Sequence, residues 1–194
     1  MYFDLYPVST FLNSNSVRVN NIPIIIDFWK YENTDVDAIY MLNSNEPCFF
    51  NTVNPIVLGE GTISPFNSQN TMFEKELFPL LYLPAFVTFR FTDILRILVA
   101  QPIMWLYNFN LGFTNATVVQ KRNPHDNFKD FISEIPMYLN SEEIIKIVSQ
   151  NISKSNTISE NLFSAYEGLS RAAIVDKKEL VLLAAWLKDL DKEF

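Results

Sequence analysis

Three charged side chains stand at the end of the most apolar stretch of the sequence, and their spacing suits acid–base chemistry. Arg90, Asp93 and Arg96 lie in FPLLYLPAFVTFRFTDILR. We expect Phe78–Phe91 to form a strand and Ile94–Tyr107 a helix, so that Asp93 opens the helix beside the strand end. Both arginines could then reach its carboxylate, which makes a charge cluster at a strand-to-helix junction, where α/β folds usually bind their ligands. A purely structural Arg–Asp–Arg network that ties strand to helix fits the same spacing equally well.

A row of small and amide side chains precedes this region, in SPFNSQNT. Asn67, Ser68, Gln69 and Asn70 can donate and accept hydrogen bonds in fixed directions, as a loop that holds sugar hydroxyls must. An ordinary turn that caps the next helix, MFEKELF, would need only one or two of these residues. We favour the binding loop.

A second polar group follows the apolar segment ATVVQ, residues 116–120, which predicts a further strand. Lys121, Arg122 and His125 emerge together at its end, and His125 is the only histidine of the chain. A lone histidine is usually structural. Beside two cations, however, it is also a reasonable ligand for a metal or a diphosphate.

Asp35 and Asp37 form a D-x-D tripeptide, a pattern that can hold a divalent metal on a nucleotide diphosphate. Here it follows the polar stretch KYENT rather than an apolar strand. We therefore favour two carboxylates at the N-terminus of a helix, DVDAIYML, over a metal site.

The remaining segments would position these groups. The run Ile22–Phe28 predicts a buried strand or an extended edge strand that begins at Pro23. Gly59 and Gly61 predict a turn and Leu111–Phe113 another, while Pro102 should kink or split its helix. The chain then turns helical, with expected helices in DNFKDFISEIPMYL, SEEIIKIVSQNI, SENLFSAYEGLSRAAI and KKELVLLAAWLKDL, the second capped by Ser141.

Composition limits the classes of function. The 194 residues are 48% hydrophobic and 14% aromatic, which indicates a folded protein. A net charge of −7 argues against nucleic acid as a partner. The single cysteine, Cys48, forms no internal disulfide, and neither a signal peptide nor a membrane-spanning run is evident. We expect a cytoplasmic protein with at most peripheral membrane contact.

The blocks DVDAIY, SPFNSQNT, LYLPAFVTFRFTDILRILVAQPIMW and VVQKRNPHDNFKDFISEIPMYL together resemble the later part of the STELLO-type family of glycosyltransferase-like proteins. The similar blocks cover roughly residues 30 to 140. A looser similarity links the chain to the reversibly glycosylated polypeptides, which are nucleotide-arabinose mutases. Both resemblances imply a GT-A fold, a Rossmann-like α/β sandwich. They divide the chain into an α/β domain, residues 1–140, and a helical C-terminal extension, residues 141–194.

The resemblance also implies a nucleotide-sugar donor, a carbohydrate acceptor and a divalent metal such as manganese or magnesium. Asp93 would be the helix-opening acid and His125 a late metal ligand. Gln101 and Trp105 would line the acceptor side.

The family's acidic metal motif on an upstream strand has no counterpart in residues 1–29. We therefore expect a chain that lacks the donor-binding half of the fold and that associates with itself or with a donor-binding chain. Two alternatives stay open: a non-catalytic relative that binds carbohydrate or a protein partner, and a subunit of a split transferase or mutase.

Overall fold

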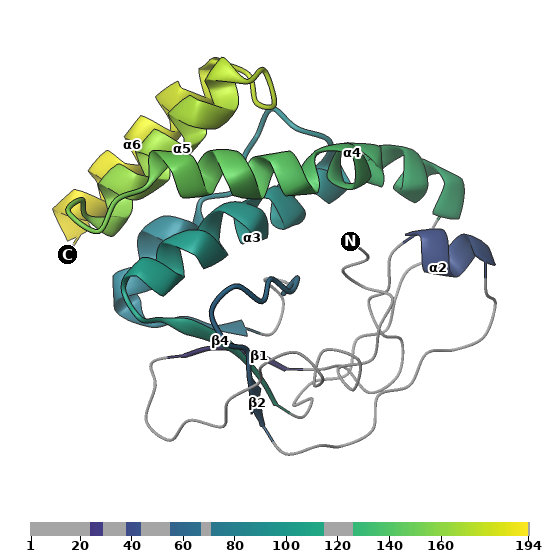
Figure 1. Ribbon diagram of the computed structural model, residues 1–194. Coiled ribbons are helices and arrows are strands. Elements are labelled where there is room, and N and C mark those ends of the chain that lie inside the picture. Colours follow the sequence, from purple (N-terminus) through teal and green to yellow (C-terminus); the bar gives the residue numbers. More distant parts are fainter. Residues whose placement is uncertain (1–23, 29–37, 44–54, 67–70, 115–125, 194) are drawn as a thin grey trace.

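A computed structural model describes residues 24–28, 38–43, 55–66, 71–114 and 126–193. A small sheet lies below a layer of helices (Figure 1). The strands are β1 (Ile24–Phe28), β2 (Ile56–Val57), β3 (Thr71–Met72) and β4 (Asn110–Thr114). The helices are α2 (Ala38–Asn43), the 3₁₀ helix η1 (Lys75–Leu81), α3 (Phe89–Leu106), α4 (Asn127–Asn151), α5 (Ile158–Arg171) and α6 (Lys178–Glu193). The predicted mixture of helix and sheet, with a helical C-terminal part, is confirmed.

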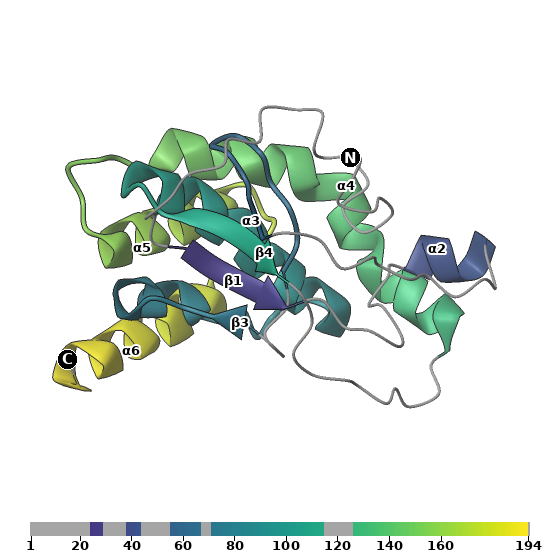
Figure 2. The same cartoon turned by 90° about the horizontal axis from the view of Figure 1, so that it is seen from below.

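The strand order is β2-β4-β1-β3, and the central strands β1 and β4 run parallel (Figure 2). The two short outer strands pair antiparallel with them. The strand predicted at Ile22–Phe28 is thus confirmed as β1, whereas the turn predicted at Leu111–Phe113 is wrong, because these residues lie in β4. Leu111 and Phe113 alternate around Gly112 and are 2% and 4% exposed, so burial of one strand face outweighs the turn signal of the glycine.

The predicted strand at Phe78–Phe91 is wrong. Its first residues belong to η1, and the last three belong to α3. Leu77 and Leu80 of η1 are fully buried, and their spacing of three matches the period of a 3₁₀ helix. Their apolar side chains pack in the same cluster as those of α5, so the run is buried among helices rather than in a sheet.

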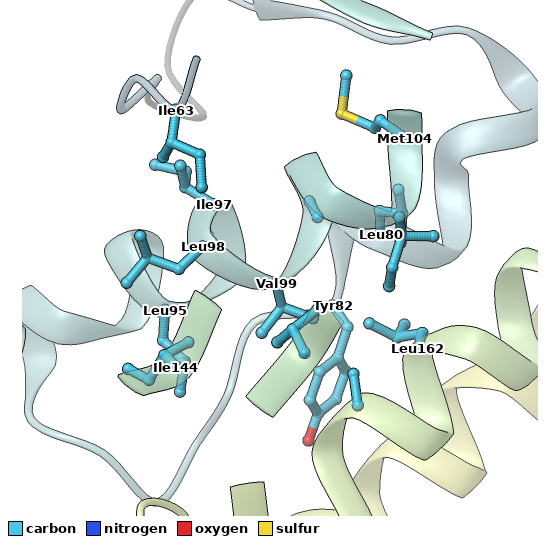
Figure 3. Packing of buried hydrophobic residues seen from close by; sticks show 14 of the residues in the cluster. Ile63, Leu80, Tyr82, Leu95, Ile97, Leu98, Val99, Met104, Ile144 and Leu162 are labelled. Atoms are coloured by element: carbon cyan, nitrogen blue, oxygen red, sulfur yellow. The ribbon is translucent and has the colours of Figure 1, made fainter. Parts of the chain in front are cut away.

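Helix α3 is the centre of the core. All ten residues from Leu95 to Met104 are buried, and their side chains reach toward Ile63 on one side and toward Ile144 of α4 and Leu162 of α5 on the other (Figure 3). The helix continues through Pro102 to Leu106 and is not split there. Packing on all sides supports this helix and offsets the hydrogen bond that the proline lacks.

Helix α4 is one helix of 25 residues, where we predicted two that meet at Ser141. The Ser141 hydroxyl does not cap a helix. It donates to the Met137 carbonyl oxygen at 2.6 Å, within the helix. The real capping box opens α5, where the Thr157 side chain accepts from the Glu160 N–H and the Glu160 carboxylate accepts from the Thr157 N–H.

Helices α3 and α5 end in the same way, with a left-handed residue followed by a backbone bond back into the last turn. These residues are Asn108, with φ of 61°, and Ala173, with φ of 58°. The Phe109 N–H donates to the Met104 carbonyl, and the Ile174 N–H donates to the Leu169 carbonyl, each at 3.0 Å. This is the Schellman pattern of a helix C-terminus.

Within the described part of the chain, none of the helices is both long and apolar enough to cross a bilayer.

Candidate functional site

The N-terminus of α3 is held on α4 by Arg90. We predicted this residue at the end of a strand, but it lies in the first turn of the helix. Its guanidinium forms ion pairs with Asp130 and, at 3.8 Å, with Glu134. The Arg90 N–H donates to the Ser133 hydroxyl at 3.0 Å, and the Thr88 hydroxyl donates to the Ser133 carbonyl at 2.6 Å. The first turn of α3 is therefore fixed in place.

Glu134 connects three helices at this position. Its side chain is 5% exposed, and its Oε2 accepts from the Ala38 N–H of α2 at 2.9 Å and from the Tyr138 hydroxyl at 3.1 Å. Sequence reasoning assigned no role to Asp130 or Glu134. Their spacing of four places them on one face of α4, which was the available signal.

Arg96 lies on another side of α3. It is 3% exposed, and its guanidinium carbon lies 5.4 Å from the centroid of the Phe66 ring, a cation–π contact. Six residues of helix turn the direction of a side chain by about 240°, so Arg90 and Arg96 contact different parts of the protein. Asp93 lies between them, half-buried, in the second turn. The prediction that it opens the helix is wrong, because α3 begins four residues earlier, at Phe89.

Gln101 fixes the segment that leads to the predicted binding loop. Its side chain is buried, and both ends of its amide bind the backbone of Ser64: Nε2 donates to the carbonyl oxygen at 2.7 Å and Oε1 accepts from the N–H at 3.1 Å. Together with the contact between Arg96 and Phe66, this bond holds residues 64–66 on α3. Trp105, half-buried at the end of the same helix, packs against the core.

Nine predicted site residues lie outside the described residues: Asp35, Asp37, Asn67, Ser68, Gln69, Asn70, Lys121, Arg122 and His125. The strand expected at 116–120 lies outside them as well. Within the described ranges, no three side chains of His, Cys, Asp or Glu gather in a way that could hold a metal ion.

A buried polar cluster that the sequence did not reveal lies where the chain leaves η1 and meets the first turn of α6. Glu179 of α6 is fully buried and accepts from the Tyr82 hydroxyl and from the N–H groups of Ala85 and Phe86, both at 2.9 Å. Burial raises the pKa of Tyr82 far above its usual value, and the bond to Glu179 adds to the rise. Burial likewise raises the pKa of Tyr166, whose ring meets that of Tyr82 edge-on with centroids 5.5 Å apart.

Helices α3 to α6 are also the part of the chain that matches a known family. The model of the STELLO glycosyltransferases matches residues 90–193, more than half of the chain. A curated relative, the probable glycosyltransferase STELLO1 of Arabidopsis thaliana, is 26% identical over 137 residues. The matched region covers 70% of this chain and 17% of the relative, so the chain spans about a sixth of that protein's length. The chain belongs to the family of STELLO glycosyltransferases.

Proposed function

We propose that this chain forms the acceptor side of a glycosyltransferase of the GT-A type, which moves a sugar from a nucleotide-sugar donor to an acceptor hydroxyl. Membership of a glycosyltransferase family supports the class of reaction. The observation that carries the site is the arrangement around α3, where one helix presents Asp93 and holds residues 64–66, which lead directly into the predicted sugar-binding loop, through Arg96 and Gln101.

In the proposed reaction, the Asp93 carboxylate accepts the proton of the acceptor hydroxyl. The acceptor oxygen then forms a bond to the anomeric carbon of the donor as the bond from that carbon to the phosphate oxygen breaks. The leaving nucleoside diphosphate carries the negative charge, which Lys121 and Arg122 would neutralise. Asn67, Ser68, Gln69 and Asn70 would bind sugar hydroxyls, and Trp105 would line the acceptor side.

Arg90, Arg96 and Gln101 act in this proposal as positioning residues. Their observed contacts are with protein groups, namely Asp130 and Glu134, Phe66 and Ser64. A divalent metal on the donor diphosphate would have His125, and less favourably Asp35 and Asp37, as ligands. No step assigned to Asp93 depends on that metal.

The test is a coupled assay of nucleotide release with a panel of nucleotide sugars and carbohydrate acceptors, with and without manganese, on the chain alone and with a donor-binding chain added. Asp93→Asn should lower turnover by about 10²-fold or more, because the amide cannot take up the proton. Asp191→Asn, at an exposed position of α6, is the matched control. Near-normal turnover by Asp93→Asn would show that the base lies elsewhere.

A second candidate is a carbohydrate-binding relative without catalysis, or one subunit of a split transferase or mutase. The amide of Gln101 binds both backbone groups of Ser64, and the Arg90 guanidinium is held by two carboxylates, so these contacts serve the protein rather than a substrate. Calorimetric titration with acceptor glycans and with nucleotide sugars separates the two functions. Acceptor binding with no turnover of any donor, by the chain alone or with a donor-binding chain added, would favour the relative without catalysis.

A further inference from the structure

Helix α4 has a buried face and, on the opposite side of its N-terminal half, an exposed apolar face. The buried face lies against α3 and includes Glu134 and Met137. The other face points away from α3 and is exposed: Phe128 is 70% exposed, Ile132 64% and Leu139 76%. A soluble helix at the surface normally presents polar residues there, so this second face needs an explanation.

The exposed face has the spacing of a packing seam. Phe128, Ile132 and Leu139 follow each other on this face together with the half-buried Ile135, at intervals of four, three and four residues, the repeat that lets two helices pack side by side. They span about 16 Å along the helix axis. Beyond Leu139 the same face continues with charged side chains, including Glu143 and Lys146, which are exposed. The apolar seam is thus confined to one half of one helix.

Each end of the seam carries one ion pair within the helix, Asp126 with Lys129 at the N-terminal end and Glu143 with Lys146 at the far end, and their order places opposite charges together when one helix is inverted. Lys129, at the N-terminal end, has an 82% exposed side chain, and Glu143, at the far end, a 54% exposed one. When two copies of α4 pack antiparallel with their centre between Ile135 and Pro136, Ile132 of one copy faces Leu139 of the other. Lys129 then lies beside Glu143 of the second copy, at both ends of the pair.

We propose that the exposed seam of α4 pairs with the same seam of a second copy of this chain, antiparallel and with two-fold symmetry. A patch that pairs with itself forms an isologous dimer, in which each contact between two residues is repeated with the two copies exchanged. Four apolar residues per chain make a small interface, so the pair forms in a concentration-dependent equilibrium. This self-pairing does not depend on the proposed transfer of a sugar.

The first test is sedimentation velocity of the full 194-residue chain from about 1 µM to about 1 mM. We expect a reversible shift from monomer to dimer. Ile132→Glu should weaken the dimer at least about tenfold, while Val181→Glu, on the 70% exposed Val181 of α6, should leave it unchanged. A chain that stays monomeric throughout this range, or a dimer that tolerates Ile132→Glu, would overturn the proposal.

Charge exchange tests the antiparallel arrangement. Glu143→Lys should weaken the dimer, and adding Lys129→Glu to the same chain should restore it. Within α4, Glu143 pairs with Lys146 and Lys129 pairs with Asp126. The double variant breaks both of these pairs, so any rescue of the dimer reports the contact between the two copies. In a Cys48→Ser background, Ile135→Cys should form an oxidised dimer, and Val181→Cys should not. Failure of both the rescue and the cross-link would exclude this geometry.

Discussion

At the scale of single residues, α3 shows that two arginines in similar sequence surroundings can have different partners. Arg90 and Arg96 look alike in FRFTDILR, yet the first is held by Asp130 and Glu134 and the second lies over the Phe66 ring. The partners come from segments far apart in the chain, so neither could be deduced from the local spacing. The sequence correctly marked these positions as unusual because burying a cation requires a partner.

Ala173 is a residue in a conformation that suits glycine. With φ of 58° at the end of α5, its side chain is strained, while its N–H and that of Ile174 form the two bonds of the Schellman pattern. Ala173→Gly should raise the free energy of unfolding by about 1 kcal/mol, measured by urea unfolding. The neighbouring Ala172→Gly, with φ of −82°, should give no such gain.

The Tyr166 hydroxyl is buried and has no hydrogen-bond partner among the described residues. Tyr166→Phe should therefore leave the free energy of unfolding unchanged or raise it by up to about 1 kcal/mol at neutral pH. Tyr138→Phe is the contrasting control, because its hydroxyl donates to Glu134, and its loss should cost about 1 kcal/mol. A clear loss of stability in Tyr166→Phe would show that the hydroxyl has a partner.

The same tyrosines predict a loss of stability in alkali. The pKa values of Tyr82 and Tyr166 are raised in the folded protein, chiefly by burial, so these groups keep their protons when the unfolded chain begins to lose them. Their contribution is complete below about pH 10, the pKa of an unfolded tyrosine, and is lost progressively as the pH rises above it. Urea unfolding between about pH 9 and about pH 11 should show this fall, and Tyr166→Phe should make it less steep.

At the scale of elements, one carboxylate in the first turn of α6 accepts three hydrogen bonds from the segment that follows η1. Glu179→Ala would leave the Tyr82 hydroxyl and two backbone N–H groups without their acceptor. We expect a loss of about 3 kcal/mol or more in the free energy of unfolding. Glu179→Gln keeps one acceptor oxygen and should lose less, and Glu167→Ala, at an exposed position of α5, should change it by less than about 0.5 kcal/mol.

The crossing of α4 and α5 depends on Gly168. A Cβ atom there would lie 2.7 Å from the Asn151 Nδ2 and 2.9 Å from the Ile147 Cγ2. Replacing glycine by alanine within a helix usually stabilises it by about 1 kcal/mol. Here Gly168→Ala should destabilise the protein instead, as thermal unfolding would show, while Ser164→Ala in the same helix should not. A stabilised Gly168→Ala variant would mean that the two helices can move apart at little cost.

At the scale of the whole molecule, sequence patterns predicted the elements whose own residues carry a clear signal. The C-terminal helices were found from their apolar periodicity, and strand β1 from its short β-branched run. The strand expected at Phe78–Phe91 failed because an apolar run buried among helices looks the same as one buried in a sheet, and the turn expected at Leu111–Phe113 failed because β4 is defined by its pairing with β1. For the same reason the roles of Glu134 and Glu179, which join distant segments, could not be predicted.

The parallel pairing of β1 with β4 has a consequence for how the chain folds. Residues 24–28 meet residues 110–114, so this part of the sheet requires closure of a long loop, whereas α4, α5 and α6 contact their neighbours in sequence. Contacts between distant residues form slowly because the chain entropy lost in closing the loop precedes any gain from packing. In refolding from urea followed by pulsed hydrogen exchange, amides of α4 to α6 should become protected before those of β1 and β4. Helices α4 to α6 would then act as the folding nucleus on which the sheet is completed.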